Sequence, residues 1–125
     1  MAVEYRFDRE KEILYITIIG SFIPEDIEQT AAYITKSNEF SPEVNTVWDI
    51  RFANFTNISL DYQEKLKNIR KRFPQRGKAK IAVVADNDLS FGLARMYEQL
   101  SAELPRKLKV FKKLNEAEKW LLNEF

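Results

Sequence analysis

An unbroken apolar run at residues 81–85 constrains the fold of this chain more than any other feature. The run includes two valines, and it lies between a basic stretch and Asp86. Such a run is typical of a β-strand that is buried on both faces. Strands of this kind occur in parallel sheets with helices packed against them, so we expect an α/β fold.

Hydrophobic periodicity and turn residues predict the other elements around this strand. A charged turn separates two β-rich stretches, 3–7 and 13–19, which therefore form a hairpin. Further strands are predicted at 46–50 and 108–111. An aromatic loop is expected at 51–58. Helices are predicted at 24–37, 59–73 and 88–104, and from residue 115 onwards.

The resulting order is β-β-α-β-α-β-α-β-α, which predicts a single-domain α/β sandwich spanning residues 1–125. Its five-stranded sheet is expected to be mainly parallel, with the first strand as an antiparallel edge. Pro24 fits a first helical position, and Ser59 fits the N-cap of the second helix. Asn115 and Glu118 resemble a capping box for the last helix.

The composition excludes several classes of site. The chain has no cysteine and no histidine, so it has no disulfide, no thiolate metal site and no imidazole base. No apolar stretch reaches the roughly 18 residues of a membrane span, and the first 20 residues carry too many charges for a signal peptide. We therefore expect a soluble, cytoplasmic protein without a metal or cofactor.

Asp49 and Asp86 are the strongest candidates for acid–base chemistry, because both follow predicted strands at the edge where open α/β folds place ligands. However, no histidine, glycine-rich phosphate loop or nucleophile elbow accompanies them. We therefore predict that the protein is not an enzyme and has no catalytic residues.

Basic residues are concentrated in one block. Residues 65–80 contain eight lysines and arginines and no acid, although the whole chain has a net charge of only +1. The block has three interpretations, which are a solvated helix face, a membrane-binding helix and a nucleic-acid-binding helix. Nucleic acid is the least favoured partner, because no recognised nucleic-acid motif is present.

The helix that carries this block also has an apolar stripe, whose members fall within about 60° of one another. Basic residues flank the stripe, as in helices that lie at a lipid interface. Equally, the stripe fits a helix that covers the sheet and leaves its basic residues in water. The preceding aromatic loop either fills the core or forms a lid over an apolar cavity. The candidate ligand- or membrane-binding residues are Phe52, Phe55, Tyr62, Lys65, Leu66, Ile69, Arg70, Arg72 and Phe73.

The order of elements, together with particular residues, resembles the SpoIIAA-like family, which is related to STAS domains and more loosely to CRAL-TRIO lipid-transfer domains. The likeness covers roughly residues 10–122. It is carried by 13–20, Val47-Trp48-Asp49-Ile50, 77–86, 91–97, and Val110-Phe111 with Glu116-Ala117 and Trp120-Leu121. The resemblance implies a non-enzymatic bacterial module. SpoIIAA-like proteins are candidates for membrane association and apolar-ligand binding, whereas STAS relatives include phosphorylation-switched antagonists of anti-sigma factors.

The STAS phosphorylation motif, Asp-Ser-Ser-Gly, aligns here with Asn57-Ile58-Ser59-Leu60. Ile58 falls at the position of the phosphorylated serine, so Ser59 serves as a phosphosite only with a loop one residue longer. The alternative is that Ser59 is a plain N-cap.

Two functional hypotheses follow. The first is a binding module for an apolar or lipid-like molecule, which also associates with anionic lipid at the inner face of the membrane through its second helix. The second is a STAS-type switch that acts on a regulatory protein. A homodimer through the first strand or an apolar helix face fits either hypothesis.

Overall fold

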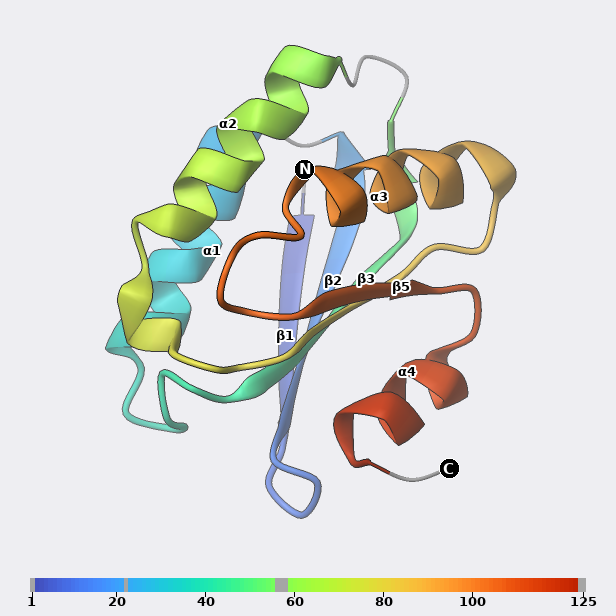
Figure 1. Cartoon of the computed structure of the whole chain (residues 1–125). Helices are drawn as coiled ribbons and strands as arrows, with labels where there is room; N and C mark the ends of the chain where they lie inside the picture. The colour runs from blue at the N-terminus through green and yellow to red at the C-terminus, as the bar shows by residue number, and fades with distance from the viewer. Residues whose placement is uncertain (1, 22, 56–58, 124–125) are drawn as a thin grey trace.

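The computed structural model describes residues 2–21, 23–55 and 59–123. These residues form one five-stranded sheet and four α-helices (Figure 1). The strands are β1 (Ala2–Asp8), β2 (Ile13–Ser21), β3 (Asn45–Asn54), β4 (Ile81–Val84) and β5 (Leu108–Phe111). The helices are α1 (Pro24–Lys36), α2 (Leu60–Lys71), α3 (Asp88–Leu100) and α4 (Leu114–Leu121), and a short 3-10 helix, η1, covers Pro74–Arg76.

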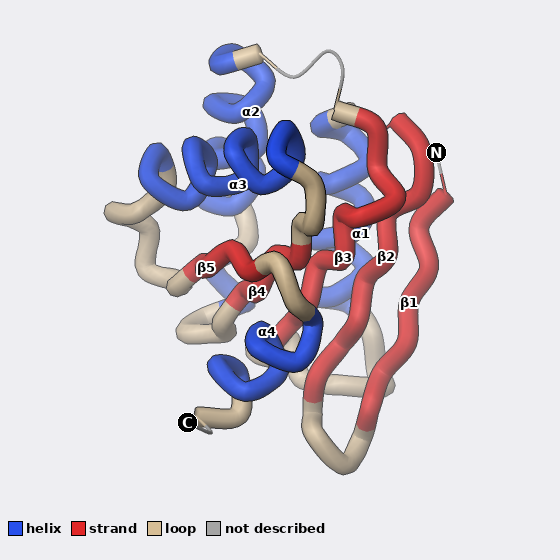
Figure 2. The backbone as a smooth tube through the Cα atoms, turned by 90° about the vertical axis from the view of Figure 1, so that its right-hand side faces the viewer, coloured by secondary structure: helices blue, strands red, loops and turns tan. Residues whose placement is uncertain are grey.

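The strands lie side by side in chain order, β1-β2-β3-β4-β5. β1 pairs with β2 in antiparallel fashion, and the other three pairings are parallel, which confirms the predicted sheet. Right-handed crossovers between successive neighbours place their helices on one face of a sheet. Accordingly, α1, α2 and α3 pack on one face, whereas α4 packs alone on the other (Figure 2).

Alternate residues of the parallel strands therefore face opposite sides of the sheet, where they enter separate cores. Ile13 and Val47 face α4, where they pack with Ala117 and Leu121. Their strand neighbours face the other three helices, in a core that includes Ile18, Ile50, Val83 and Val110. The β4 residues are buried in both cores, as the apolar run predicts.

The predicted loop at 51–58 is wrong over its first residues, because β3 continues to Asn54. The register of the β2–β3 pairing shifts between Thr17 and Ile19, after which Ile19 pairs with Phe52. Hydrogen bonding to β2, which is not visible in the local sequence of 51–54, extends the strand. Residues 56–58 lie outside the described part of the chain.

The helix ends show which predicted caps and boundaries the structure contains. Pro24 is the first residue of α1, and the Ser59 side chain accepts a hydrogen bond from the Tyr62 backbone N–H at 3.2 Å, so both predictions are confirmed. The predicted capping box at Asn115 is wrong, because α4 begins one residue earlier and has Lys113 as its N-cap. The third helix ends at Leu100 rather than near residue 104.

None of the helices in the described segments is long and apolar enough to cross a membrane. Within the same segments, no group of three or more acidic side chains is arranged to hold a metal ion.

Candidate ligand cavity between the sheet and three helices

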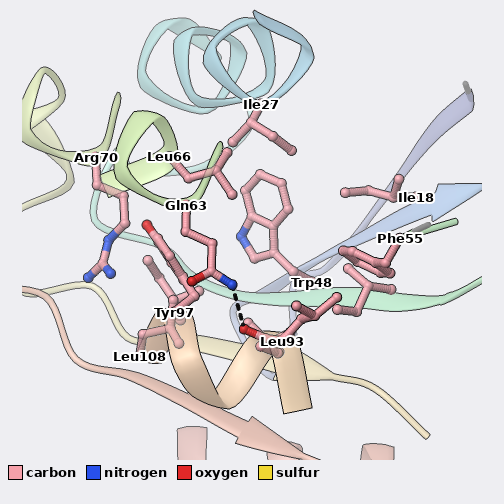
Figure 3. Close-up of a pocket in the computed structure, with 14 residues that line it drawn as sticks. Ile18, Ile27, Trp48, Phe55, Gln63, Leu66, Arg70, Leu93, Tyr97 and Leu108 are labelled. Atoms are coloured by element: carbon pink, nitrogen blue, oxygen red, sulfur yellow. Dashed lines mark hydrogen bonds between the residues drawn. The ribbon is translucent and has the colours of Figure 1, made fainter. Parts of the chain in front are cut away.

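A cavity of about 140 Å³ lies between the sheet and helices α1–α3 (Figure 3). Its floor consists of strand residues that point toward these helices, among them Ile18, Trp48, Ile50 and Leu108. The alternation of the strands explains this lining, because every second residue of four neighbouring strands reaches the same face.

The helices supply the opposite wall of the cavity. Ile27 comes from α1, Leu66 from α2, and Leu93 and Ala94 from α3. Phe55, just after β3, closes one side next to Ile18 (Figure 3). The side chains around most of this space are therefore aliphatic or aromatic.

Gln63 of α2 is the exception in the middle of the lining. It is only 3% exposed, and its Nε2 donates a hydrogen bond to the Leu93 carbonyl at 3.1 Å. Its Oε1 is buried and has no hydrogen-bond partner among the described residues. A buried amide of this kind normally satisfies both of its ends, so the free oxygen is a specific feature of this cavity.

Arg70 marks the end of the cavity near the carboxyl terminus of α2. Its two Nη atoms donate to Ser101 Oγ and to the Arg106 carbonyl, each at 2.8 Å. Its Nε is buried and lacks a partner in the described part of the chain. Burial raises the pKa of the Tyr97 hydroxyl beside it, an effect that the positive charge and hydrogen bonding of Arg70 oppose.

A second arginine, Arg106, lies next to Arg70 but outside the cavity lining. Arg106 donates to the backbone carbonyls of Arg70 and Phe73, where α2 ends. Cations are favourable at such a position, because the last carbonyls of a helix carry partial negative charge. Burial lowers the pKa of the Arg106 guanidinium, and the charge of Arg70 lowers it further. The cavity therefore has a positively charged end.

Five of the nine predicted site residues lie on the inner side of α2 or beside it. Phe55, Leu66 and Arg70 line the cavity. Tyr62 packs against the core beneath, and Ile69 is buried. The apolar stripe thus faces the sheet, which was one of the two interpretations of this helix.

The other four predicted residues lie outside the cavity lining. Lys65 pairs with Asp61 at 3.7 Å, and Arg72 pairs with Glu28 at 2.9 Å, on the exposed side of the helix. Phe52 is exposed at the end of β3. Phe73 is half-buried just after α2, where its carbonyl accepts the bond from Arg106.

Sequence reasoning missed Gln63, Trp48, Leu93 and Tyr97. One signal for Gln63 was present, because it stands seven residues before Arg70 and two helical turns place both on one flank of the stripe. Polar residues beside an apolar stripe ordinarily reach solvent, so the pattern alone does not indicate that α3 covers them.

Ser59 is exposed and acts as the N-cap of α2. Its role as a phosphosite stays a prediction, and the aligned positions Asn57 and Ile58 lie outside the described residues.

Asp49 does not form an open acid–base site. It is 7% exposed and accepts two bonds from the Arg51 side chain, at 2.9 and 2.7 Å, on the sheet face opposite the cavity. Hydrogen bonding to Asp49 raises the pKa of the Arg51 guanidinium. Both carboxylate oxygens of Asp49 are therefore already occupied by the Arg51 side chain.

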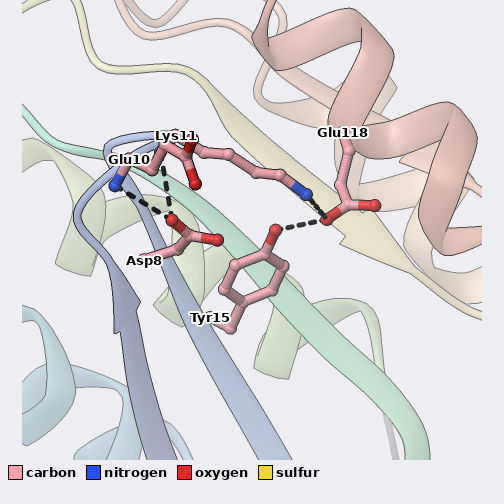
Figure 4. Close-up of polar contacts among 5 residues, drawn as sticks. All are labelled: Asp8, Glu10, Lys11, Tyr15 and Glu118. Atoms are coloured by element: carbon pink, nitrogen blue, oxygen red, sulfur yellow. Dashed lines mark hydrogen bonds and ion pairs between the residues drawn. The ribbon is translucent and has the colours of Figure 1, made fainter.

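A polar cluster attaches α4 to the β1–β2 hairpin (Figure 4). The Tyr15 hydroxyl donates to the Glu118 carboxylate, which also pairs with Lys11 at 3.3 Å. Asp8 accepts bonds from the backbone N–H groups of Glu10 and Lys11 in the turn. Burial raises the pKa of Tyr15, and the hydrogen bond to Glu118 raises it further. The cluster holds elements together and lies away from the cavity.

No protein-family model and no curated protein sequence matches this chain. Among solved structures, the chain is similar to an uncharacterised protein of the DUF3478 family from Shewanella loihica PV-4, which has a SpoIIAA-like fold. The two are 19% identical with a TM-score of 0.62, and the match covers 96% of this chain and 92% of the other. This chain therefore has the SpoIIAA-like α/β fold that its sequence predicts.

Proposed function

We propose that this protein is a non-catalytic binding module that holds a small apolar molecule between the sheet and helices α1–α3. The observation that carries the proposal is the cavity of about 140 Å³ with an almost wholly apolar lining. Ligand sites are typically concave and apolar, with a few polar groups that fix orientation. Gln63 and Arg70 are the polar residues of the lining that could fix the orientation of a ligand.

The volume limits the size of the ligand. An engineered apolar cavity of about 150 Å³ binds benzene, so this space suits a benzene-sized body or part of one acyl chain. A complete phospholipid requires far more room. Of the lipid-like ligands expected from the sequence, we therefore propose only a small molecule or a single short acyl chain for this cavity.

Toluene is a suitable probe of this proposal. A ligand that binds only the folded state stabilises it, so toluene should raise the melting temperature in a concentration-dependent way. The Ala94→Leu variant fills part of the cavity and should abolish this response. The exposed Ala102→Leu variant, which adds the same atoms outside the cavity, should retain it. An equal response of all three proteins, or none by the wild type, would refute binding in this cavity.

Peripheral membrane contact is the second candidate function, and a different observation favours it. Large apolar side chains are exposed at the carboxyl edge of the sheet, with Phe52 at 59% and Leu60 at 61% exposure. Ile23 before α1 and Leu89 in the first turn of α3 are exposed at the same edge. Singly exposed apolar residues are common, but a group at one edge fits insertion into a lipid interface.

Vesicle sedimentation separates the apolar edge from the basic helix. The Phe52→Ser/Leu60→Ser variant should lose binding to phosphatidylserine vesicles at all salt concentrations if the edge inserts. The Lys65→Gln/Arg72→Gln variant tests the electrostatic contribution, which should weaken as salt rises from about 0.05 to 0.5 M. Because both basic residues already have acidic partners, we expect the second variant to lose less binding. If the wild-type protein does not sediment with the vesicles, the proposal of membrane contact is refuted.

A further inference from the structure

We propose that the molecule held in this cavity carries a neutral hydrogen-bond donor, a hydroxyl or amide N–H, which it presents to Gln63 Oε1. This inference rests on the proposed function, because it names the chemistry of the ligand for the same site. Gln63 would then be the residue that determines specificity, whereas the apolar walls supply most of the contact surface.

The orientation of the Gln63 amide follows from its neighbour. The Leu93 carbonyl can only accept a hydrogen bond, so the amide nitrogen must face it, as the bond of 3.1 Å shows. The amide oxygen is thereby turned away from Leu93 and lies on the side of Tyr97, which also lines the cavity (Figure 3). A flip of the amide, which would exchange the oxygen and the nitrogen, would therefore break the bond to Leu93 and does not explain the missing partner of the oxygen.

The oxygen is also shielded from solvent. Gln63 is 3% exposed, and its Oε1 has no partner in the described segments. A buried acceptor without a partner has lost its bonds to water and gained nothing in exchange, so a donor that reaches it is strongly favoured. A ligand hydroxyl or amide N–H supplies such a donor, while an alkane or a simple aromatic ring does not.

The charge around the cavity restricts the donor further. Ammonium groups also donate, but Arg70 places a positive charge at one end of the cavity, and Arg106 lies next to it outside the lining. Neither arginine belongs to an ion pair among the described residues, and both bond to neutral oxygens. A cationic ligand would be repelled, and a carboxylate could accept from the buried Arg70 Nε but could not donate to the Gln63 oxygen. A neutral donor fits both constraints.

Phenol, anisole and toluene test this inference directly. All three have one ring that suits the volume, but only phenol has a donor. We expect phenol to bind the wild-type protein about tenfold more tightly than toluene or anisole in a calorimetric titration, a ratio equivalent to about 1.4 kcal/mol. The Gln63→Met variant has a similar shape without the acceptor, and it should lose this preference or reverse it.

The outcomes distinguish the two levels of the proposal. If none of the three probes binds the wild type, the proposed function fails together with this inference. If they bind equally well, or with the same ratio in Gln63→Met, the apolar site stands and the role of Gln63 is refuted. Tighter binding of benzoate than of phenol would also overturn it, because the polar contact would then belong to Arg70. Where Gln63→Met does not fold, equal binding of phenol and anisole by the wild type still refutes the requirement for a donor.

Discussion

Arg76 shows how a single charged residue is accommodated inside this fold. The side chain is 4% exposed, and its guanidinium donates to the carbonyls of Pro42 and Val44 at 2.7 and 2.6 Å. Burial lowers its pKa to about 10, so the group remains charged at neutral pH. The charge is held by backbone dipoles rather than by a carboxylate.

We predict that Arg76→Met lowers the free energy of unfolding by about 2–3 kcal/mol, because the buried Val44 carbonyl and the partly buried Pro42 carbonyl lose their donor. Arg76→Lys should also be destabilising, since an ammonium lacks the planar fork that reaches two carbonyls. Urea denaturation measures both changes. The exposed Lys78→Met serves as the control and should change stability by no more than about 0.5 kcal/mol. Equal stability of wild type and Arg76→Met would contradict the assigned contacts.

From the raised pKa of Tyr15, we predict that the protein loses stability at alkaline pH. Its pKa is raised in the folded state, so the folded protein retains a proton that the unfolded chain releases above about pH 10. The stabilising contribution is complete below that pH and decreases as the pH rises. For one proton the slope reaches about 1.4 kcal/mol per pH unit. Tyr15→Phe should show a smaller loss between pH 9 and 11 in urea denaturation, and an identical slope would argue against a shifted Tyr15.

At the scale of elements, α2 connects the exposed edge of the molecule to the cavity. Its N-cap, Ser59, is exposed, while Gln63 and Ile69 on the inner side are buried. The helix thus depends on a local capping bond at one end and on tertiary packing along its length.

We predict that Ser59→Ala lowers the free energy of unfolding by about 1 kcal/mol, because the Tyr62 N–H loses its acceptor. Ser59→Asp should be nearly neutral, since aspartate caps equally well and its charge suits the positive end of the helix. Thermal or urea denaturation of the three proteins checks this order. A neutral Ser59→Ala would indicate that the cap contributes little.

The elements that the sequence predicts well are those with strong local patterns. Local sequence alone predicts three of them, which are the apolar run of β4, the β1–β2 hairpin and the proline at the start of α1. The end of β3 was missed because its last residues pair with β2 after a register shift. The start of α4 was misplaced because Asn115 and Glu118 do not cap it, and Glu118 instead bonds to Tyr15 on another element.

The candidate site was predicted in part for the same reason. Leu66 and Phe55 were identified because they are apolar and lie near a helix with a clear stripe. The inward direction of Arg70 depends on Ser101 and the Arg106 carbonyl, which come from a distant segment. No pattern within α2 reveals these partners.

At the scale of the whole molecule, the sheet separates the core under α4 from the core under α1–α3. The core under α4 is built around Ala117 and Leu121, which are almost fully buried. The core under α1–α3 contains the cavity and is therefore less closely packed there. We infer that stability and ligand binding can be altered independently.

Two substitutions on opposite faces of the sheet test this division. Leu121→Ala should lower the free energy of unfolding by about 2–5 kcal/mol, the range for a buried leucine, and should leave the affinity for phenol unchanged. Leu66→Ala removes a half-buried side chain beside existing space, so we expect a smaller loss of about 1–2 kcal/mol together with a changed affinity. The double variant should lose the sum of the two within about 0.5 kcal/mol, as expected for sites without shared contacts. A larger coupling energy, or an effect of Leu121→Ala on phenol binding, would show that the sheet transmits strain between the cores.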